Sequence, residues 1–138
     1  MKNTKKQKPI IFIQDTGIYG LEMIVAVGAN KKQFESFVKR KVTITEAKEV
    51  VLGDSGIWDF YNGKLGTTMS YKDGGMTLLM YPYEDTWQFW EVLIHELNHI
   101  VDYASESRNL SRDIESRAYL QEYLFHSIRR KLMGLDKK

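Results

Sequence analysis

The stretch "WEVLIHELNHIVDY", residues 90–103, decides the interpretation of this sequence. It places two of the chain's three histidines, His95 and His99, in a run dominated by large apolar side chains, with Glu96 between them. Polar groups that enter a hydrophobic core need partners, and a charged group needs them most. The three polar side chains are therefore expected to have a binding partner, and a metal ion is one that fits them.

The spacing predicts a helix over this stretch, which Asp85 or Thr86 can cap at its N-terminus. Its core face is expected to comprise Trp90, Leu93, Ile94, Leu97, Val101 and Ala104. Residues i and i+4 are neighbours on one face of a helix, roughly 5 to 6 Å apart at Cβ, so His95 and His99 can aim at one point. A tetrahedral zinc ion at about 2.0 to 2.1 Å from each imidazole nitrogen fits between them.

Glu96 follows His95 by about 100° around the helix, which places it beside such a metal but outside its ligand shell. Zinc lowers the pKa of a bound water towards about 7, and a neighbouring carboxylate can take the proton as that water attacks a carbonyl group. A chance match to His-Glu-x-x-His is expected in about three per thousand chains of this composition. The motif therefore predicts a zinc site with Glu96 as its general base.

Catalytic zinc sites usually have three protein ligands. The last predicted helix, near residues 112–133, carries Glu115, Tyr119, Glu122 and His126 within one narrow stripe. We expect Glu115 to be the third ligand because it lies in the first turn, near the loop that folds this helix back; Asp113, Glu122 and His126 are the alternatives.

Asp102 lies three residues after His99, on the histidine side of the helix. It can accept a hydrogen bond from an imidazole that ligates the metal. Helix capping, or an ion pair with Arg108 or Arg112, is the alternative. Possible donors to a developing oxyanion are Tyr103, Tyr119 and Tyr123.

These residues resemble the zincin metallopeptidases, and specifically the gluzincin pattern of HExxH followed by a glutamate on a later helix. "HELNHIVDY" with "DIESRAYLQEYL" is similar to small metallopeptidase-like proteins of bacteriophages and mobile elements. The resemblance covers about residues 76–128. It implies His95, His99 and Glu115 as zinc ligands, Glu96 as base, and a sheet whose edge strand, expected at "MTLLMYP", holds an extended peptide above the metal.

The rest of the chain predicts a small α+β domain, a minimal zincin-like fold with a mostly antiparallel sheet. "KPIIFIQ" and "LEMIVAVGA" are expected to be its first two strands, and Asn30 to cap a helix over 30–41. "TTMSY" and "MTLLMYP" flank Asp73-Gly74-Gly75, which is typical of a tight hairpin. Residues 42–65 are expected to form a strand, a helical turn and a glycine-rich loop.

We expect a basic tail over 1–8, one domain over 9–134 and a short tail over 135–138. The chain has no cysteine, so any metal must bind to His, Asp, Glu or carbonyl oxygen. The N-terminal apolar run is too short for a signal peptide or a membrane span, which together with the absence of cysteine favours the cytoplasm.

Residues 9–128 hold 11 basic and 17 acidic groups, so the net charge of +2 comes from the two ends of the chain. A few terminal lysines do not make a nucleic-acid-binding face, and we expect neither a nucleic-acid nor a membrane partner. The sequence thus predicts a zinc-dependent peptidase that acts on a specific intracellular protein. The second interpretation is a non-catalytic, zinc-stabilised protein-binding module of phage or mobile-element origin.

Overall fold

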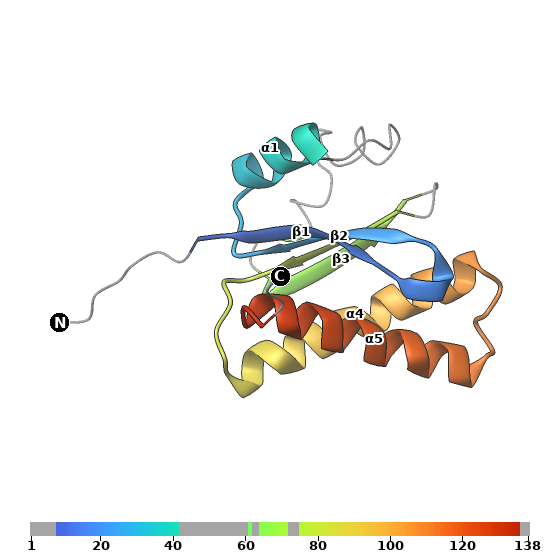
Figure 1. The fold of residues 1–138 in the computed structure, drawn as a ribbon. Helices are drawn as coiled ribbons and strands as arrows, with labels where there is room; N and C mark the ends of the chain where they lie inside the picture. Colours follow the sequence, from blue (N-terminus) through green and yellow to red (C-terminus); the bar gives the residue numbers. More distant parts are fainter. Residues whose placement is uncertain (1–7, 42–60, 62–63, 72–74, 136–138) are drawn as a thin grey trace.

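The structure is a computed structural model that describes residues 8–41, 61, 64–71 and 75–135. Most of the strand, turn and loop predicted over residues 42–65 lies outside these residues, as does the tip of the predicted Asp73-Gly74-Gly75 hairpin. The described residues form an α+β fold, as the sequence predicts, with one four-stranded sheet and helices on both of its faces (Figure 1).

The sheet contains β1 (Ile10–Asp15), β2 (Glu22–Val27), β3 (Gly66–Ser70) and β4 (Met76–Met80), in the order β1-β2-β4-β3. The predicted hairpin is confirmed by the antiparallel pairing of β3 with β4, and the first two predicted strands, β1 and β2, also pair in antiparallel fashion. A parallel pairing of β2 with β4 joins them. The prediction that "MTLLMYP" is an edge strand is wrong: β4 lies between β2 and β3, and all five of its residues are buried.

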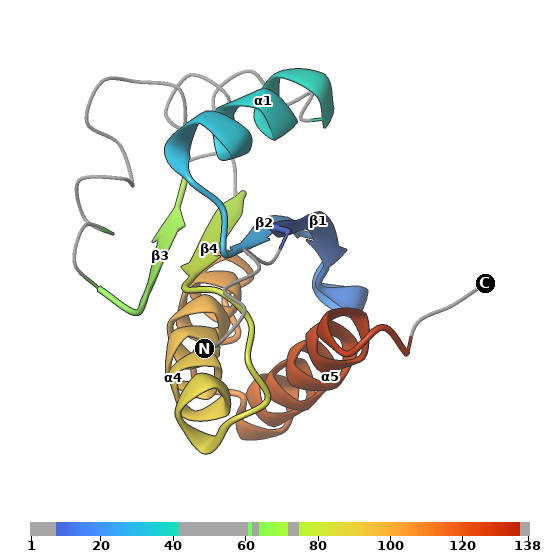
Figure 2. The ribbon, with the colours of Figure 1, turned by 90° about the vertical axis from the view of Figure 1, so that its left-hand side faces the viewer.

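The helices form one layer on each face of the sheet. Figure 2 shows α1 (Lys31–Lys41) on one face, and α4 (Trp87–Ser107) with α5 (Ile114–Leu132) side by side on the other. A short 3-10 turn, η1 (Gly17–Tyr19), connects β1 to β2. None of the helices in the described part of the chain is both long enough and apolar enough to cross a membrane.

The helix ends follow local capping chemistry. Asn30 Oδ1 accepts from the Gln33 amide at 2.8 Å and Gln33 Oε1 accepts from the Asn30 amide at 2.9 Å, which is the reciprocal capping box that the sequence predicts. Thr86 caps α4 through the Phe89 amide, and Asp113 caps α5 through the Ser116 amide. Gly134, with φ +69°, follows the end of α5.

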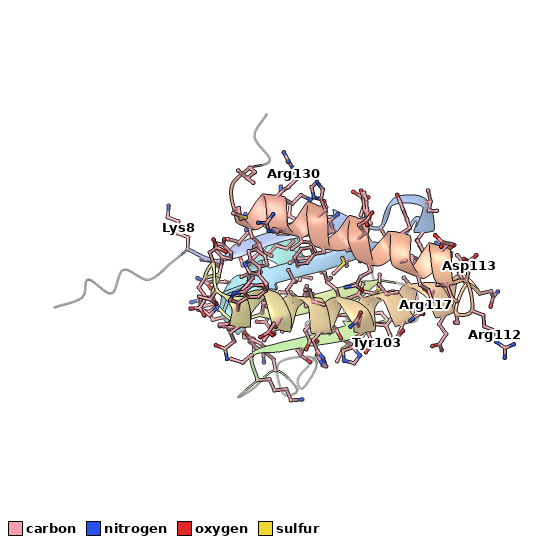
Figure 3. All side chains as sticks on the ribbon, turned by 90° about the horizontal axis from the view of Figure 1, so that it is seen from below. Lys8, Tyr103, Arg112, Asp113, Arg117 and Arg130 are labelled. Carbon is pink, nitrogen blue, oxygen red and sulfur yellow. The ribbon has the colours of Figure 1, made fainter. Side chains whose placement is uncertain are left out.

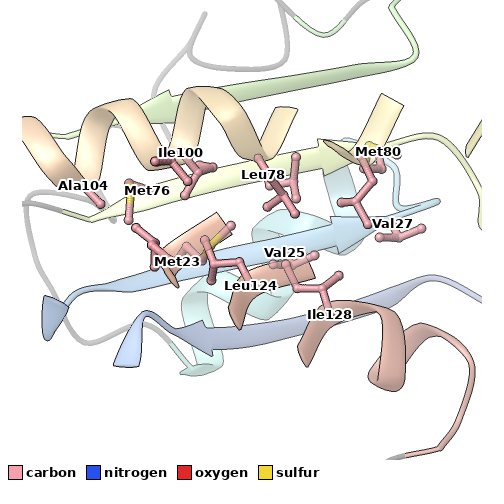
Figure 4. Packing of buried hydrophobic residues seen from close by; sticks show 14 of the residues in the cluster. Met23, Val25, Val27, Met76, Leu78, Met80, Ile100, Ala104, Leu124 and Ile128 are labelled. Carbon is pink, nitrogen blue, oxygen red and sulfur yellow. The ribbon is translucent and has the colours of Figure 1, made fainter. Parts of the chain in front are cut away.

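The main core lies between the sheet and the pair α4–α5 (Figure 4). The sheet contributes Met23, Val25, Val27, Met76, Leu78 and Met80, and the helices contribute Ile100, Ala104, Leu124 and Ile128 among others. Of the predicted core face of α4, Leu93, Leu97, Val101 and Ala104 are buried and Trp90 is half-buried. Ile94 is 42% exposed, and the buried side of α4 instead includes Phe89 and Ile100, which the predicted face left out.

Asp15 at the end of β1 accepts hydrogen bonds from the Tyr123 hydroxyl of α5 and from the Gly17 amide. The bond from Tyr123 lowers the pKa of Asp15 and raises that of Tyr123 to about 12. A depressed carboxyl pKa stabilises the fold above its unfolded value of about 3.9, and that stability is lost as the pH falls through the lower folded pKa.

We therefore expect Tyr123→Phe to lower the free energy of unfolding at neutral pH by less than about 1 kcal/mol, since both groups face solvent. The difference from the wild type should vanish as acid protonates Asp15, and also as base ionises Tyr123 near pH 12. Denaturant titrations across pH measure it, and a difference independent of pH contradicts this role for the pair.

Candidate metal centre

His95 and His99 lie one turn apart on α4, with ring centroids 5.0 Å apart and ring planes at 84°. Both side chains are exposed. Neither makes a hydrogen bond to another described residue, so no interaction within that part of the structure occupies their nitrogen atoms. The helix thus brings two imidazoles to one point of the surface, as the four-residue spacing predicts.

Glu96, between the two histidines in sequence, is directed towards β3 and is only 8% exposed. The Thr68 side chain of β3 lies beside its carboxylate. Burial raises the pKa of Glu96, while the neighbouring His99, His95 and Lys64, and to a smaller extent Thr68, act in the opposite direction. A largely buried carboxylate beside two accessible imidazoles is therefore the main polar feature of this end of the core.

Gly66 allows β3 to lie close against α4. A Cβ atom added there would lie 3.0 Å from Glu96 Cγ and 3.1 Å from both Met80 Sδ and Val92 Cγ1. Contacts of this length are tighter than nine in ten of those that real Cβ atoms make, so the neighbours would have to give way by a few tenths of an ångström. The absence of a side chain at residue 66 thus helps to hold Glu96 beneath the strand.

We expect Gly66→Val to lower the free energy of unfolding by about 1 to 3 kcal/mol, because it overpacks the contact between β3 and α4. It should also displace Glu96. Ser70→Val, at the exposed end of the same strand, is the matched control. Thermal unfolding of both variants measures the effect, and equal stability of the two contradicts the close approach of Gly66.

Asp102 forms an ion pair with Arg117 of α5. The proposed partners Arg108 and Arg112 are not used: the Arg108 side chain instead donates to the carbonyl oxygens of Tyr19 and Gly20 at 2.7 and 3.4 Å. Figure 3 shows Arg117 between the two helices. In this arrangement Asp102 ties α5 to α4, and no hydrogen bond joins it to His99 among the described residues.

The predicted stripe of α5 lies on a different side of that helix. Glu115 is two residues before Arg117, about 200° around the helix, so it turns away from the α4 side to which Arg117 points. Further along the stripe, Tyr119, Glu122 and His126, with Tyr123, line a surface cavity of about 410 Å³. Gly17 and Asp15 border this region, because a Cβ at Gly17 would lie 3.1 Å from the Tyr119 hydroxyl and Tyr123 bonds Asp15.

Glu115 is exposed in the first turn of α5, where the structure does not gather it with His95 and His99. Within the described residues, no group of three or more His, Asp or Glu side chains is close enough to hold a metal ion. Glu115 as third ligand therefore stays a prediction. Among the three tyrosines proposed as oxyanion donors, Tyr103 lies one turn after His99 on α4, whereas Tyr119 and Tyr123 lie on the side of α5 that faces β1.

Thr68 and Gly66 are the residues of this site that the sequence did not reveal. Gly66 and Thr68 are two residues apart on β3, so both lie on the same side of the strand. A threonine and a glycine in a strand carry no signal of chemistry by themselves, and their role depends on the tertiary contact between β3 and α4.

Comparisons of the chain with protein-family models, with curated proteins and with solved structures found no match.

Proposed function

We propose that this chain is a zinc-dependent metallopeptidase in which His95 and His99 bind the metal and Glu96 is the general base. The observation that carries the proposal is the combination on α4 of two exposed imidazoles, 5.0 Å apart, with a carboxylate buried beneath the neighbouring strand. Neutral imidazole is a preferred zinc ligand, so the donor chemistry of this pair fits the ion. Bound there, zinc supplies Lewis acidity that activates water and polarises a carbonyl group.

Glu96 is suited to proton transfer by its surroundings. Burial raises the pKa of Glu96 above its ordinary value, which makes its carboxylate a stronger base, and the Thr68 side chain lies beside it. In the proposed reaction Glu96 accepts the proton of the attacking water and later donates it to the amine that leaves. A site that only stabilised the fold has no use for a carboxylate in this position, and its burial costs free energy.

The substrate-binding strand of the proposal is β3. Among the described residues it is the last strand of the sheet and lies directly beside α4. An edge strand offers unpaired backbone groups to an extended peptide, and Gly66 and Thr68 lie next to Glu96 on this strand. A peptide added to β3 therefore runs past the general base. The proposed substrate is an extended segment of a specific intracellular protein, in keeping with the cytoplasmic location expected from the cysteine-free sequence.

The experiment is incubation of the zinc-loaded chain, purified without a histidine tag, with a library of extended apolar peptides and detection of cleavage products by mass spectrometry. Cleavage that a chelator abolishes and zinc restores supports the peptidase. If the chain binds zinc stoichiometrically and unfolds at a higher temperature with it, yet cleaves no peptide of the library, the second interpretation, a zinc-stabilised protein-binding module, replaces it.

A further inference from the structure

The opposite edge of the sheet, far from the histidines, is formed by β1, and its surroundings differ in charge from the rest of the molecule. Five of the eleven residues of α1 are basic and only Glu35 is acidic. Elsewhere within residues 9–128, six basic residues stand against sixteen acidic ones. The helix that covers one face of the sheet is thus a basic patch within residues 9–128, whose 11 basic and 17 acidic groups give a net charge of −6.

A groove of about 500 Å³ separates α1 from β1. It is lined by Pro9, Ile11, Lys32, Gln33, Ser36, Phe37 and Arg40. Ile11 and Phe37 form an apolar floor, and both are only half-buried. Lys32 and Arg40 also line the groove, are exposed, and make no ion pair with any residue that the structure describes. The groove therefore combines accessible apolar surface with positive charges that lack a described counterion.

The strand beside the groove is itself an edge. β1 pairs with β2, and in the described sheet no strand lies on its other side. Residues 10–13, "IIFI", are half-buried, and no charged residue interrupts them. On the α5 side of the strand, Lys131 Nζ bonds Gln14 Oε1 at 2.9 Å and lies 4.8 Å from the centre of the Phe12 ring. Figure 2 shows β1 at the rim of the sheet, between α1 and α5.

From this arrangement we propose that β1 is a docking edge for an extended acidic segment of a partner protein, which adds a strand to the sheet. The backbone of the segment pairs with β1. Its side chains alternate between the groove, where acids meet Lys32 and Arg40, and the α5 side, where they meet Lys131. Apolar side chains of the segment pack on Ile11 and Phe37.

Charge decides between this occupant and a second copy of the chain. An isologous pairing of two β1 edges brings the basic α1 helices of both copies to the same junction, where like charges repel. An acidic partner is attracted to this edge and repelled by the rest of the acidic surface, which directs it to β1. A nucleic acid is less well matched, because the groove offers one half-buried aromatic ring and no row of exposed aromatic side chains. The surface is separate from the metal centre, so its test leaves the zinc site untouched.

The first experiment is selection of random displayed peptides against the full chain at physiological ionic strength, with counter-selection against Lys32→Glu plus Arg40→Glu. We expect enriched peptides that are rich in acidic residues and also contain β-branched ones, which favour an extended strand. The double variant should bind them about tenfold more weakly or worse, because it replaces two attractive contacts with two repulsive ones. Lys31→Glu plus Lys41→Glu changes the charge of the same helix equally, outside the groove, and should keep most of the affinity. Failure to enrich peptides, enrichment of basic ones, or equal loss in both double variants overturns the proposal.

Hydrogen exchange of the backbone amides tests the strand addition itself. A selected peptide should slow exchange at β1 amides that do not bond β2, and a proline in the middle of the peptide should abolish binding. If those amides are as protected in the free chain as the amides of β2, another part of the chain or a second copy already occupies the edge, and the proposal fails. Tight binding of single-stranded oligonucleotides that Lys32→Glu plus Arg40→Glu removes would show a nucleic-acid surface instead.

Discussion

Glu96→Gln should keep its zinc and its fold and lose a factor of about 10² to 10⁴ in the rate of peptide hydrolysis, the usual contribution of a positioned general base. The substitution preserves side-chain volume, but an amide cannot accept the proton of the attacking water. Because the amide carries no charge to desolvate under β3, the variant should be at least as stable as the wild type.

Glu91→Gln is the matched control for this variant. Glu91 is an exposed glutamate on the same helix, five residues before Glu96. Its replacement therefore makes the same chemical change at an exposed position. Rates of cleavage, zinc content and unfolding temperature should be measured for both variants. Equal rates for Glu96→Gln and the wild type, at full zinc content, would show that the proposed mechanism is wrong even where the metal site is right.

His95→Ala plus His99→Ala should abolish stoichiometric zinc binding, because it removes both imidazoles from α4. Ligand bound to the native state stabilises it by about 4 kcal/mol when free zinc is about a thousandfold above the dissociation constant. Zinc should therefore raise the unfolding temperature of the wild type, a chelator should reverse the rise, and the double variant should respond to neither. Asn98→Ala is the control, since Asn98 is an exposed residue of the same helix that lies between the two histidines in sequence.

The same zinc titration on Glu115→Ala tests the predicted third ligand. A weaker affinity than that of the wild type supports Glu115, which requires α5 to turn its first residues towards α4 when the metal binds. An unchanged affinity, with a loss in Glu122→Ala or His126→Ala, moves the ligand to another part of the predicted stripe. Retained zinc in the double histidine variant contradicts the placement of the site altogether.

Local sequence rules predicted much of the fold. The periodicity of α4, the caps at Asn30 and Thr86 and the glycine after α5 depend on neighbouring residues, and the structure confirms each of them. The position of β4 in the sheet was mispredicted because strand order depends on long-range pairing. A central strand buried on both faces reads as a continuous apolar run, and "MTLLM" is such a run.

In the candidate site, too, local features could be predicted from the sequence and tertiary contacts could not. His95, Glu96 and His99 are placed by helical spacing alone, so their arrangement could be read from the motif. The contact of Glu96 with Thr68 and the turn of Glu115 away from α4 depend on how α4 packs against β3 and α5. The spacing of residues along a helix shows which of them share a face. It does not show which other element packs against that face, because that depends on the tertiary structure.

The most direct test of the zinc site is X-ray absorption spectroscopy at the zinc edge on zinc-loaded His126→Ala, in which His95 and His99 are the only histidines left. Two imidazoles per zinc, with nitrogen distances of about 2.0 to 2.1 Å, are the predicted result. Zinc held with fewer than two imidazoles would contradict the assignment of His95 and His99 as the metal ligands.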